Sequence, residues 1–246
     1  EIGTIQPLVR IGKLIKEFGS KKNQGVKNRW PIFHADCSQA PLYLDCMVER
    51  LGVDLMTLDG HKMHGPKGVG ILYARRGTLL APVLFGGGQE RGIRSTTENV
   101  PLVVGFAKAF ELAIKNREKE SVRLKKLRDY VFLNLPKNNC IKINGDTKDR
   151  LPNNVNVSLL GVDTEFAVLK LDVMGIAAST KSSCLGTEGA SYVVKALGGA
   201  KPDFKNSVAR SSKDELGEVA RANSTLRFTF GSATTKKDVD YLLKCL

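Results

Sequence analysis

One stretch, residues 53–70, constrains the fold of this chain more than any other. An apolar run from Val53 to Leu58 has the length and the flanking residues of a buried strand. It is followed by Gly60-His61-Lys62 and then by a Gly-Pro-Lys-Gly turn at residues 65–68. Glycine on both sides of the lysine lets the backbone come close to a bulky ligand. Taken alone, such a segment is more often a surface turn with solvated lysines.

A second strand-like run, residues 30–35, lies upstream and leads directly into Asp36. A carboxylate after one strand and Lys62 after the next suit the chemistry of a carbonyl cofactor such as pyridoxal phosphate. A lysine amine that is partly deprotonated by its surroundings forms a Schiff base with the carbonyl. The pyridinium nitrogen needs a carboxylate partner to stay protonated and to accept electrons.

Periodicity and capping residues predict an α/β fold with a mostly parallel sheet that is covered by helices. Strands are predicted at residues 30–35, 53–58, 70–75, 79–84, 141–144, 155–159 and 224–231. Helices are predicted at residues 7–18, 45–51, 100–135, around 166–171, from 191 and from 236.

The apolar faces of two helices can be predicted from the same periodicity. The first helix is expected to bury Ile11, Leu14, Ile15 and Phe18, and the helix around 166–171 to bury Phe166, Leu169 and Leu171. The helix at 100–135 is long enough to cross between domains. We therefore expect a large domain at residues 1–115 and a small α+β domain at residues 116–246.

Composition narrows the class of protein. The chain has 246 residues, 42% of them hydrophobic, which suits a globular protein with a sizeable core. No apolar run is long enough to span a membrane, and no signal segment is recognisable, so no membrane association is expected. Five cysteines without CxxC spacing argue against a disulfide framework or a zinc ribbon and favour a reducing cytoplasm. No metal site is predicted.

The net charge of +13 raises the possibility of a nucleic acid or an acidic protein as partner. The basic residues are spread along the chain, with runs at 117–126 and 201–213, and no aromatic residues are interleaved among them. A solvated surface on a protein that binds an anionic cofactor is therefore the preferred interpretation. Nucleic-acid binding ranks below it.

Three further segments contain residues suited to chemistry. Residues 85–99 form a glycine-rich loop with two arginines and three hydroxyl side chains, which could cradle a phosphate, although such loops are commonly connectors. Cys184 lies in a small polar loop with Lys181 nearby, as a reactive thiolate requires, whereas most free cysteines are buried. Arg227 on the strand at 224–231 could clamp a carboxylate, whereas most such arginines form surface ion pairs.

Taken together, these segments resemble one family. His34-x-Asp36-x-x-Gln39, followed by Gly60-His61-Lys62, resembles the class V branch of fold-type I pyridoxal-phosphate enzymes. The run Gly-Gly-Gly-x-Glu-Arg-Gly-x-Arg-Ser-x-Thr at residues 86–97, the segments at Cys184 and at 191–198, and the strand at Arg227 follow in the order found in cysteine desulfurases of the NifS/IscS group. The resemblance covers nearly all of the chain.

The resemblance implies roles for individual residues. Asp36 would pair with the ring nitrogen of pyridoxal phosphate, Gln39 would face the ring hydroxyl, and Lys62 would form the Schiff base. His61 would bind the phosphate, and Thr97 would reach the phosphate in the neighbouring subunit, which implies a homodimer with shared active sites. Lys67, the rival lysine, would belong to the structural turn. Cys184 would be the sulfur nucleophile, and Arg227 would bind the substrate carboxylate.

The implied reaction is removal of sulfur from L-cysteine, giving L-alanine and a persulfide on Cys184. The sulfur would pass to an acceptor such as an iron–sulfur scaffold or a tRNA-thiolation relay. A related class V enzyme, such as a selenocysteine lyase or an aminotransferase, is the nearest alternative. A non-catalytic fragment that acts as a binding partner in iron–sulfur assembly is the alternative from another class.

The sequence departs from the family pattern at several positions. Asp59 stands where many relatives have a hydroxyl or small residue near the phosphate, and its carboxylate would repel that group unless it points away. Thr96 replaces a usual glycine, and residues 201–222 form a polar insertion. The family's N-terminal portion is expected to be missing, with Glu1-Ile2-Gly3 as the remainder of its last motif.

Overall fold

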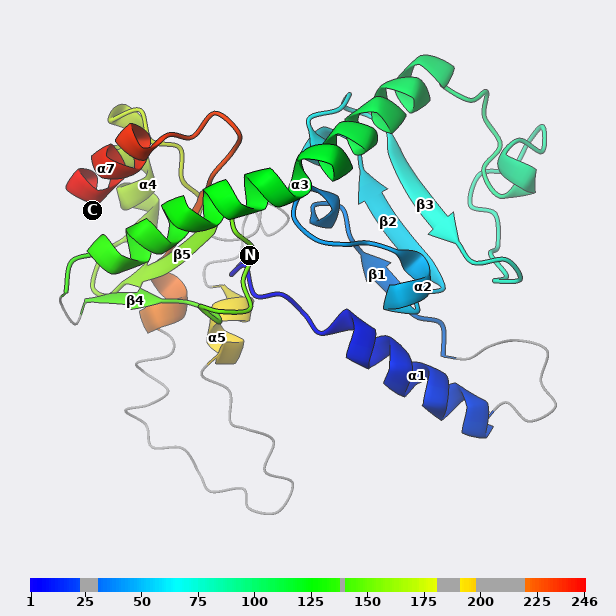
Figure 1. The fold of residues 1–246 in the computed structure, drawn as a ribbon, viewed down its shortest axis with the longest axis horizontal. Coiled ribbons are helices and arrows are strands. Elements are labelled where there is room, and N and C mark those ends of the chain that lie inside the picture. Colours follow the sequence, from blue (N-terminus) through cyan, green and yellow to red (C-terminus); the bar gives the residue numbers. More distant parts are fainter. Residues whose placement is uncertain (23–30, 138–139, 181–190, 198–219) are drawn as a thin grey trace. The chain divides into compact units, whose positions relative to one another are not determined.

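The computed structural model describes residues 1–22, 31–137, 140–180, 191–197 and 220–246 (Figure 1). The chain forms two compact units. One unit comprises residues 6–119, and the other combines residues 1–5 with residues 120–246. The long helix predicted at 100–135 is present as α3 (Val100–Asn134), and its residues are divided between the two units.

The unit at residues 6–119 is built around a three-stranded sheet with the order β1-β2-β3, in which β1 is His34–Asp36, β2 is Leu55–Asp59 and β3 is Gly70–Ala74. Strands β1 and β2 are parallel, with Asp36 opposite Thr57, so their carboxyl ends lie at one edge of the sheet. Strand β3 is antiparallel to β2, with Asp59 opposite Gly70. Figure 1 shows the three strands side by side.

The antiparallel placement of β3 follows from the length of its connection. Only residues 60–69 join β2 to β3, whereas a parallel partner needs a crossover of about a dozen residues or more. The strand predicted at 79–84 is wrong, because the structure has only an isolated bridge between Leu84 and Arg94 there. Pro82 lies inside that run, and proline removes the donor that a strand ladder requires.

The core of this unit lies between the sheet, α1 (Leu8–Lys22), the short helix α2 (Val48–Leu51) and the first half of α3. The face of α1 that packs on the core is centred on Gly12, where a Cβ atom would lie 2.3 Å from the carbonyl oxygen of Leu51. Ile11 and Ile15 pack against the core as predicted. Leu14 and Phe18 are 56% and 48% exposed, so that part of the predicted face is wrong.

The second unit contains an antiparallel sheet with the order β4-β5-β6, in which β4 is Ile141–Ile143, β5 is Asn154–Leu159 and β6 is Thr225–Thr229. The helices α4 (Thr164–Val173), α5 (Tyr192–Leu197) and α7 (Lys236–Cys245) accompany it. The central strand β5 is almost wholly buried. Thr235 and Asp238 form a capping box at the start of α7, the helix that was predicted from 236.

The apolar face predicted for α4 is wrong in two of its three residues. Phe166 and Leu169 are 67% and 65% exposed, and only Leu171 is buried. Thr164 is also buried and donates a hydrogen bond to the carbonyl of Asn223 (3.0 Å). Positions 164 and 171 are two turns apart and share a face, which leaves position 166 on the opposite side of the helix.

Two buried arginines support the second unit. Arg128 donates hydrogen bonds to the carbonyls of Arg150 and Leu151, each at 3.0 Å, and Arg150 donates to the carbonyl of Asn144 (2.6 Å). Both guanidinium groups lie over the ring of Phe132. Burial, followed by the charge of Arg128, lowers the pKa of Arg150 to about 10. Arg128 also pairs with the carboxylate of Asp129 (2.7 Å), and Arg150 donates to the side-chain oxygen of Asn154 (3.0 Å), so the two arginines hold the turn before β5.

In the part of the chain that the structure describes, no helix combines the length and the apolar character that crossing a membrane requires.

Candidate active site

The carboxyl ends of β1 and β2 place polar side chains at the same edge of the sheet. Asp36 is the last residue of β1, and Asp59 is the last residue of β2. His34 Nε2 lies 2.8 Å from the hydroxyl of Thr57, which joins the two strands by a side-chain hydrogen bond. Loops that follow parallel strands at such an edge are where ligands bind in open α/β sheets.

The strands reach this edge in register because their opposite ends are tied together. Asp54 is buried and accepts a hydrogen bond from the backbone N–H of Phe33 (3.0 Å). The guanidinium of Arg75 lies 3.3 Å from the Asp54 carboxylate and donates to the carbonyl of Val53 (2.8 Å). The charge of the buried carboxylate is therefore paired, and β1, β2 and the residue after β3 are held together.

Asp36 is kept ionised by its neighbours. Its carboxylate accepts hydrogen bonds from the backbone N–H of Ser38 (2.9 Å) and from the Ser38 hydroxyl. Burial by itself raises the pKa of Asp36, but the bonds from Ser38, together with the positive charges of Lys62 and His34, lower it by more. The net pKa lies below the ordinary value, so Asp36 carries a negative charge at neutral pH. The structure thus brings Asp36 and Lys62 close enough for their charges to interact.

Lys62 lies in a short turn of 3₁₀ helix, His61–Met63, directly after β2. The turn is closed by hydrogen bonds from Gly60 N to the carbonyl of Val69 (3.0 Å) and from Gly65 N to the carbonyl of Gly60 (2.9 Å). A Cβ atom at Gly60 would lie 2.9 Å from the Val69 oxygen, so only glycine allows this close approach. The side chain of Met63 is buried and anchors the turn, while that of Lys62 is exposed.

Asp59 and His61 are joined at the same edge. One carboxylate oxygen of Asp59 accepts from the backbone N–H of His61 (3.2 Å) and lies 2.8 Å from the ring Nδ1 of His61. The side chain of Asp59 therefore contacts both the backbone and the ring of His61. This pairing was not predicted from the sequence, although aspartate two residues before a backbone N–H is a common turn contact.

The other predicted cofactor residues lie in exposed segments of the same unit. Gln39 is at the N-terminus of the 3₁₀ turn Ala40–Leu42, one residue after Ser38. Thr97 lies between the 3₁₀ turn Glu90–Gly92 and α3. Its contact with the cofactor of a neighbouring subunit stays a prediction.

The glycine-rich loop itself has a defined shape. Gly92 N donates to the carbonyl of Gly88 (2.9 Å), and Gly88 N donates to the hydroxyl of Ser95 (3.3 Å). Glu90 and Arg91 both have left-handed backbone angles, with φ of 47° and 60°. Left-handed non-glycine residues carry a conformational cost that is concentrated at functional loops in proteins.

Arg227 lies in the second unit, in the middle of β6 and opposite Asn156 of β5. Its backbone also pairs with Ser179, since Arg227 N donates to the carbonyl of Ser179 (2.7 Å) and Ser179 N donates back (3.1 Å). A rigid strand is a suitable base for a guanidinium that must hold a carboxylate. The residue as a whole is partly exposed.

Cys184 lies outside the described residues, but the positions on both sides of its segment are anchored. Ser179 pairs with β6 before residues 181–190. After them, Ser191 N donates to the carbonyl of Ala222 (3.2 Å), and the Ser191 hydroxyl contacts the carboxylate of Glu1 and accepts from Val194 N (3.0 Å). Ser191 thereby caps α5. Neither Ser179 nor Ser191 was singled out from the sequence.

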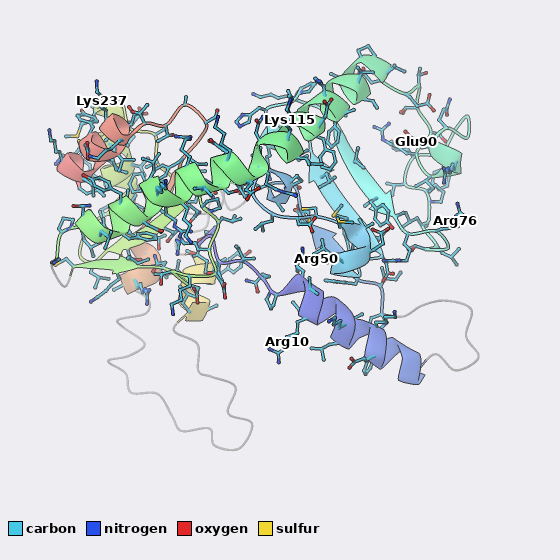
Figure 2. All side chains as sticks on the ribbon, in the orientation of Figure 1. Arg10, Arg50, Arg76, Glu90, Lys115 and Lys237 are labelled. Atoms are coloured by element: carbon cyan, nitrogen blue, oxygen red, sulfur yellow. The ribbon has the colours of Figure 1, made fainter. Side chains whose placement is uncertain are left out.

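The charged side chains are distributed over many elements. Figure 2 shows that Arg10 comes from α1, Arg76 from the segment after β3, and Lys237 from α7. Among the described residues, no group of three or more histidine, cysteine or carboxylate side chains is placed to hold a metal ion.

Comparison with known proteins decides the family. The family model named aminotransferase class-V matches residues 1–242. The chain belongs to this family. It is 37% identical to a cysteine desulfurase IscS of Dictyoglomus turgidum and 39% identical to cysteine desulfurase IscS 1 of Archaeoglobus fulgidus, over 100% of its own length. It spans 56% and 57% of the length of these two relatives.

Solved structures of two NifS-like proteins have the same fold. A NifS-like protein with 31% sequence identity superimposes with a TM-score of 0.75, over 99% of this chain and 56% of that one. A NifS-like protein from Rickettsia africae, with 23% identity, has a TM-score of 0.74, over 100% of this chain and 57% of that one. The chain therefore has the α/β fold of fold-type I enzymes that was expected from the motifs.

Enzymes of this family use pyridoxal phosphate, and the side chains at the sheet edge fit that group. The edge carries an ionised carboxylate, a primary amine, an exposed amide and an imidazole, which are the kinds of group that can bind the ring nitrogen, the aldehyde, the ring hydroxyl and the phosphate of this cofactor. The close packing at Gly60 keeps the lysine turn compact beside them.

Proposed function

We propose that the protein to which this chain belongs is a cysteine desulfurase, which removes sulfur from L-cysteine with pyridoxal phosphate as cofactor. One observation carries the proposal: Asp36, which accepts two hydrogen bonds from Ser38, and the turn that contains Lys62 lie at the carboxyl ends of two parallel strands, at the same edge of the sheet. Membership of the class-V family and the similarity to several IscS proteins support it.

Four side chains of the unit at residues 6–119 would hold the cofactor. Asp36 would bind the ring nitrogen, Gln39 the ring hydroxyl and His61 the phosphate, while Lys62 would hold the aldehyde group. When bound, the cofactor supplies an electron sink for the substrate carbon. Thr97 would contact the phosphate of the cofactor bound to a second copy of the chain, so we include a homodimer in the proposal.

The remaining steps fall to the chain's own residues. Arg227 holds the substrate carboxylate through paired N–H groups. The amine of Lys62 would take the proton from the substrate's Cα. The low pKa of Asp36 keeps its charge available to retain the proton on the ring nitrogen.

Sulfur transfer would be the task of Cys184. Its thiolate attacks the sulfur of the substrate, a sulfur–sulfur bond forms and the carbon–sulfur bond breaks. The electron pair of the broken bond stays on the substrate's Cβ, which takes up a proton. Return of a proton to Cα then gives L-alanine, and the persulfide stays on Cys184. An acceptor such as an iron–sulfur scaffold or a tRNA-thiolation relay would then take the sulfur.

We further propose a cytoplasmic location. Among the described residues, Cys37, Cys46 and Cys245 form no disulfide, which suits a reducing compartment and persulfide chemistry.

An absorbance spectrum with added pyridoxal phosphate tests the proposal. We expect the protein to develop a band near roughly 400 nm, the region of a protonated lysine Schiff base. The Lys62→Ala variant should lack the band, and the matched variant Lys67→Ala, in the turn that follows, should retain it. Retention of the band in Lys62→Ala would reject the assignment of the lysine.

Sulfide release from L-cysteine, with Cys184→Ser as the variant, separates the related enzyme classes. We expect turnover in the parent protein and its loss in Cys184→Ser. Unchanged turnover in that variant would favour a class V enzyme that does not use a thiol nucleophile. A cofactor band without turnover of cysteine would favour an aminotransferase.

A further inference from the structure

The carboxylate of Asp59 stands two residues from His61, the side chain assigned above to a phosphate. A carboxylate so close to a bound phosphate would repel it unless the carboxylate interacts with a positively charged or hydrogen-bonding group. The structure shows such an interaction: one oxygen of Asp59 accepts a hydrogen bond from the backbone N–H of His61 at 3.2 Å and contacts the His61 ring Nδ1 at 2.8 Å. Asp59 therefore contacts His61 through both its backbone and its side chain.

The backbone around the pair is rigid. Asp59 ends β2 and is opposite Gly70 of β3. Gly60, which separates the two residues, is buried and packed against the carbonyl of Val69. With both backbones fixed, the contact at Nδ1 restricts the rotation of the imidazole ring about its side-chain bonds.

The contact also decides where the ring carries its proton. A carboxylate accepts hydrogen bonds and cannot donate them, so Nδ1 must carry a hydrogen. In the neutral ring Nε2 is then an acceptor, and when the ring is protonated Nε2 becomes a donor while Nδ1 stays on Asp59. Nε2 has no hydrogen-bond partner among the described residues, and half of the side chain is exposed.

We propose that Asp59 is a positioning residue, which holds the His61 ring by Nδ1 so that Nε2 serves the phosphate monoester of the cofactor. The three groups would lie in the order carboxylate, imidazolium and phosphate, so the positive charge separates the two negative ones. The inference rests on the proposed function for the identity of the anion. The placement of the proton on Nδ1 does not depend on it.

The first test is an NMR measurement on the ligand-free protein. The chain has three histidines, so the ¹⁵N signals of His61 can be assigned by their loss in His61→Ala. Under conditions in which the ring is neutral, we expect His61 of the parent to be protonated at Nδ1. In Asp59→Ala the ring should shift toward protonation at Nε2, and Asp59→Asn, which keeps an acceptor oxygen, should restore much of the parent signature.

The second test is the dissociation constant of pyridoxal phosphate, measured by spectral titration. We expect Asp59→Ala to weaken binding about tenfold, the loss of one charge-assisted contact, and Asp59→Asn to recover part of it. His61→Ala should weaken binding as well, and the double variant should be no worse than His61→Ala alone, because Asp59 acts through the ring.

Asp45→Ala is the matched control. Asp45 also accepts from the backbone N–H two residues along the chain, that of Met47 at 3.1 Å, and it pairs with Arg50 at 2.9 Å. Its removal takes away a carboxylate and a turn contact in the same unit without touching His61. We expect no change in the His61 signals or in the dissociation constant.

Two outcomes would overturn the inference: an unchanged His61 signature in Asp59→Ala, or tighter binding of the cofactor by that variant, which would mean that repulsion dominates. If the parent protein binds no pyridoxal phosphate, the proposed function fails, while the NMR measurement still decides whether Asp59 positions the ring.

Discussion

The backbone of Arg227 pairs with that of Ser179, through hydrogen bonds of 2.7 Å and 3.1 Å. The bridge is antiparallel and adds the segment before residues 181–190 to the edge of β6. The strand β6, which carries Arg227, therefore also pairs with the residue that lies shortly before the segment containing Cys184. The residue proposed to bind the substrate carboxylate and the start of the segment proposed to transfer sulfur would thus both be attached to β6.

Replacement of Arg227 should impair substrate binding more than the fold. We expect Arg227→Ala to raise the KM for L-cysteine at least about tenfold, because a charge-assisted bond to the carboxylate is lost. Arg227→Lys should recover only part of the loss, since lysine lacks the paired N–H groups. Steady-state kinetics of sulfide release measures the effect, with Arg10→Ala on the exposed face of α1 as the control. An unchanged KM would remove Arg227 from the substrate site.

Removal of the Ser38 hydroxyl should raise the pKa of Asp36, because the hydroxyl stabilises the ionised carboxylate. A ¹³C NMR titration of the Asp36 carboxyl in Ser38→Ala measures the shift. Thr57→Ala, which removes a partner of His34 instead, is the control. A pKa of Asp36 that does not rise in Ser38→Ala would contradict the structure.

The same contact predicts a pH dependence of stability. The pKa of Asp36 is lowered in the folded protein, so its contribution to stability is present above the unfolded-state pKa and is lost as the pH falls through the folded-state pKa. Ser38→Ala reduces this contribution. The difference in free energy of unfolding between parent and variant should therefore be largest at neutral pH and should shrink in acid. Urea denaturation over a pH series measures it.

Gly12→Ala should destabilise the unit at residues 6–119. The new Cβ would lie 2.3 Å from the carbonyl oxygen of Leu51 and 3.4 Å from the ring of Phe33. We expect a loss of about 1–3 kcal/mol from overpacking, although alanine favours a helix over glycine by about 1 kcal/mol. Thermal unfolding measures the effect. Gly231→Ala is the control, because no heavy atom lies within 4 Å of its Cβ position, and a stabilised Gly12→Ala would disprove the close packing of α1.

Thr235→Ala should weaken the start of α7. The Thr235 hydroxyl accepts from Asp238 N, and the Asp238 carboxylate accepts from Thr235 N at 2.8 Å. Loss of such a cap costs about 1 kcal/mol. Denaturant unfolding measures the change, and Ser232→Ala, at an exposed side chain nearby, should have no effect. Equal stability of the two variants would mean that the capping box contributes nothing.

Local patterns in the sequence predicted much of the framework. The strands that end near Asp36 and Asp59, the strand that carries Arg227, the long helix α3 and the start of α7 all lie where they were expected. Runs of apolar residues, their period and their flanking caps are properties of short segments, so they can be read without knowing what packs against them.

Tertiary structure decided what depends on distant partners. The direction of β3 and the face on which Phe166 is exposed were not visible in the local pattern, because the partner strand and the opposing surface determine them. At the site, the sequence by itself supplied a carboxylate and a lysine after successive strands. Only the folded chain decided that Ser38 keeps Asp36 ionised and that Asp59 turns to His61, because hydrogen bonds of defined length require both backbones to be fixed in space.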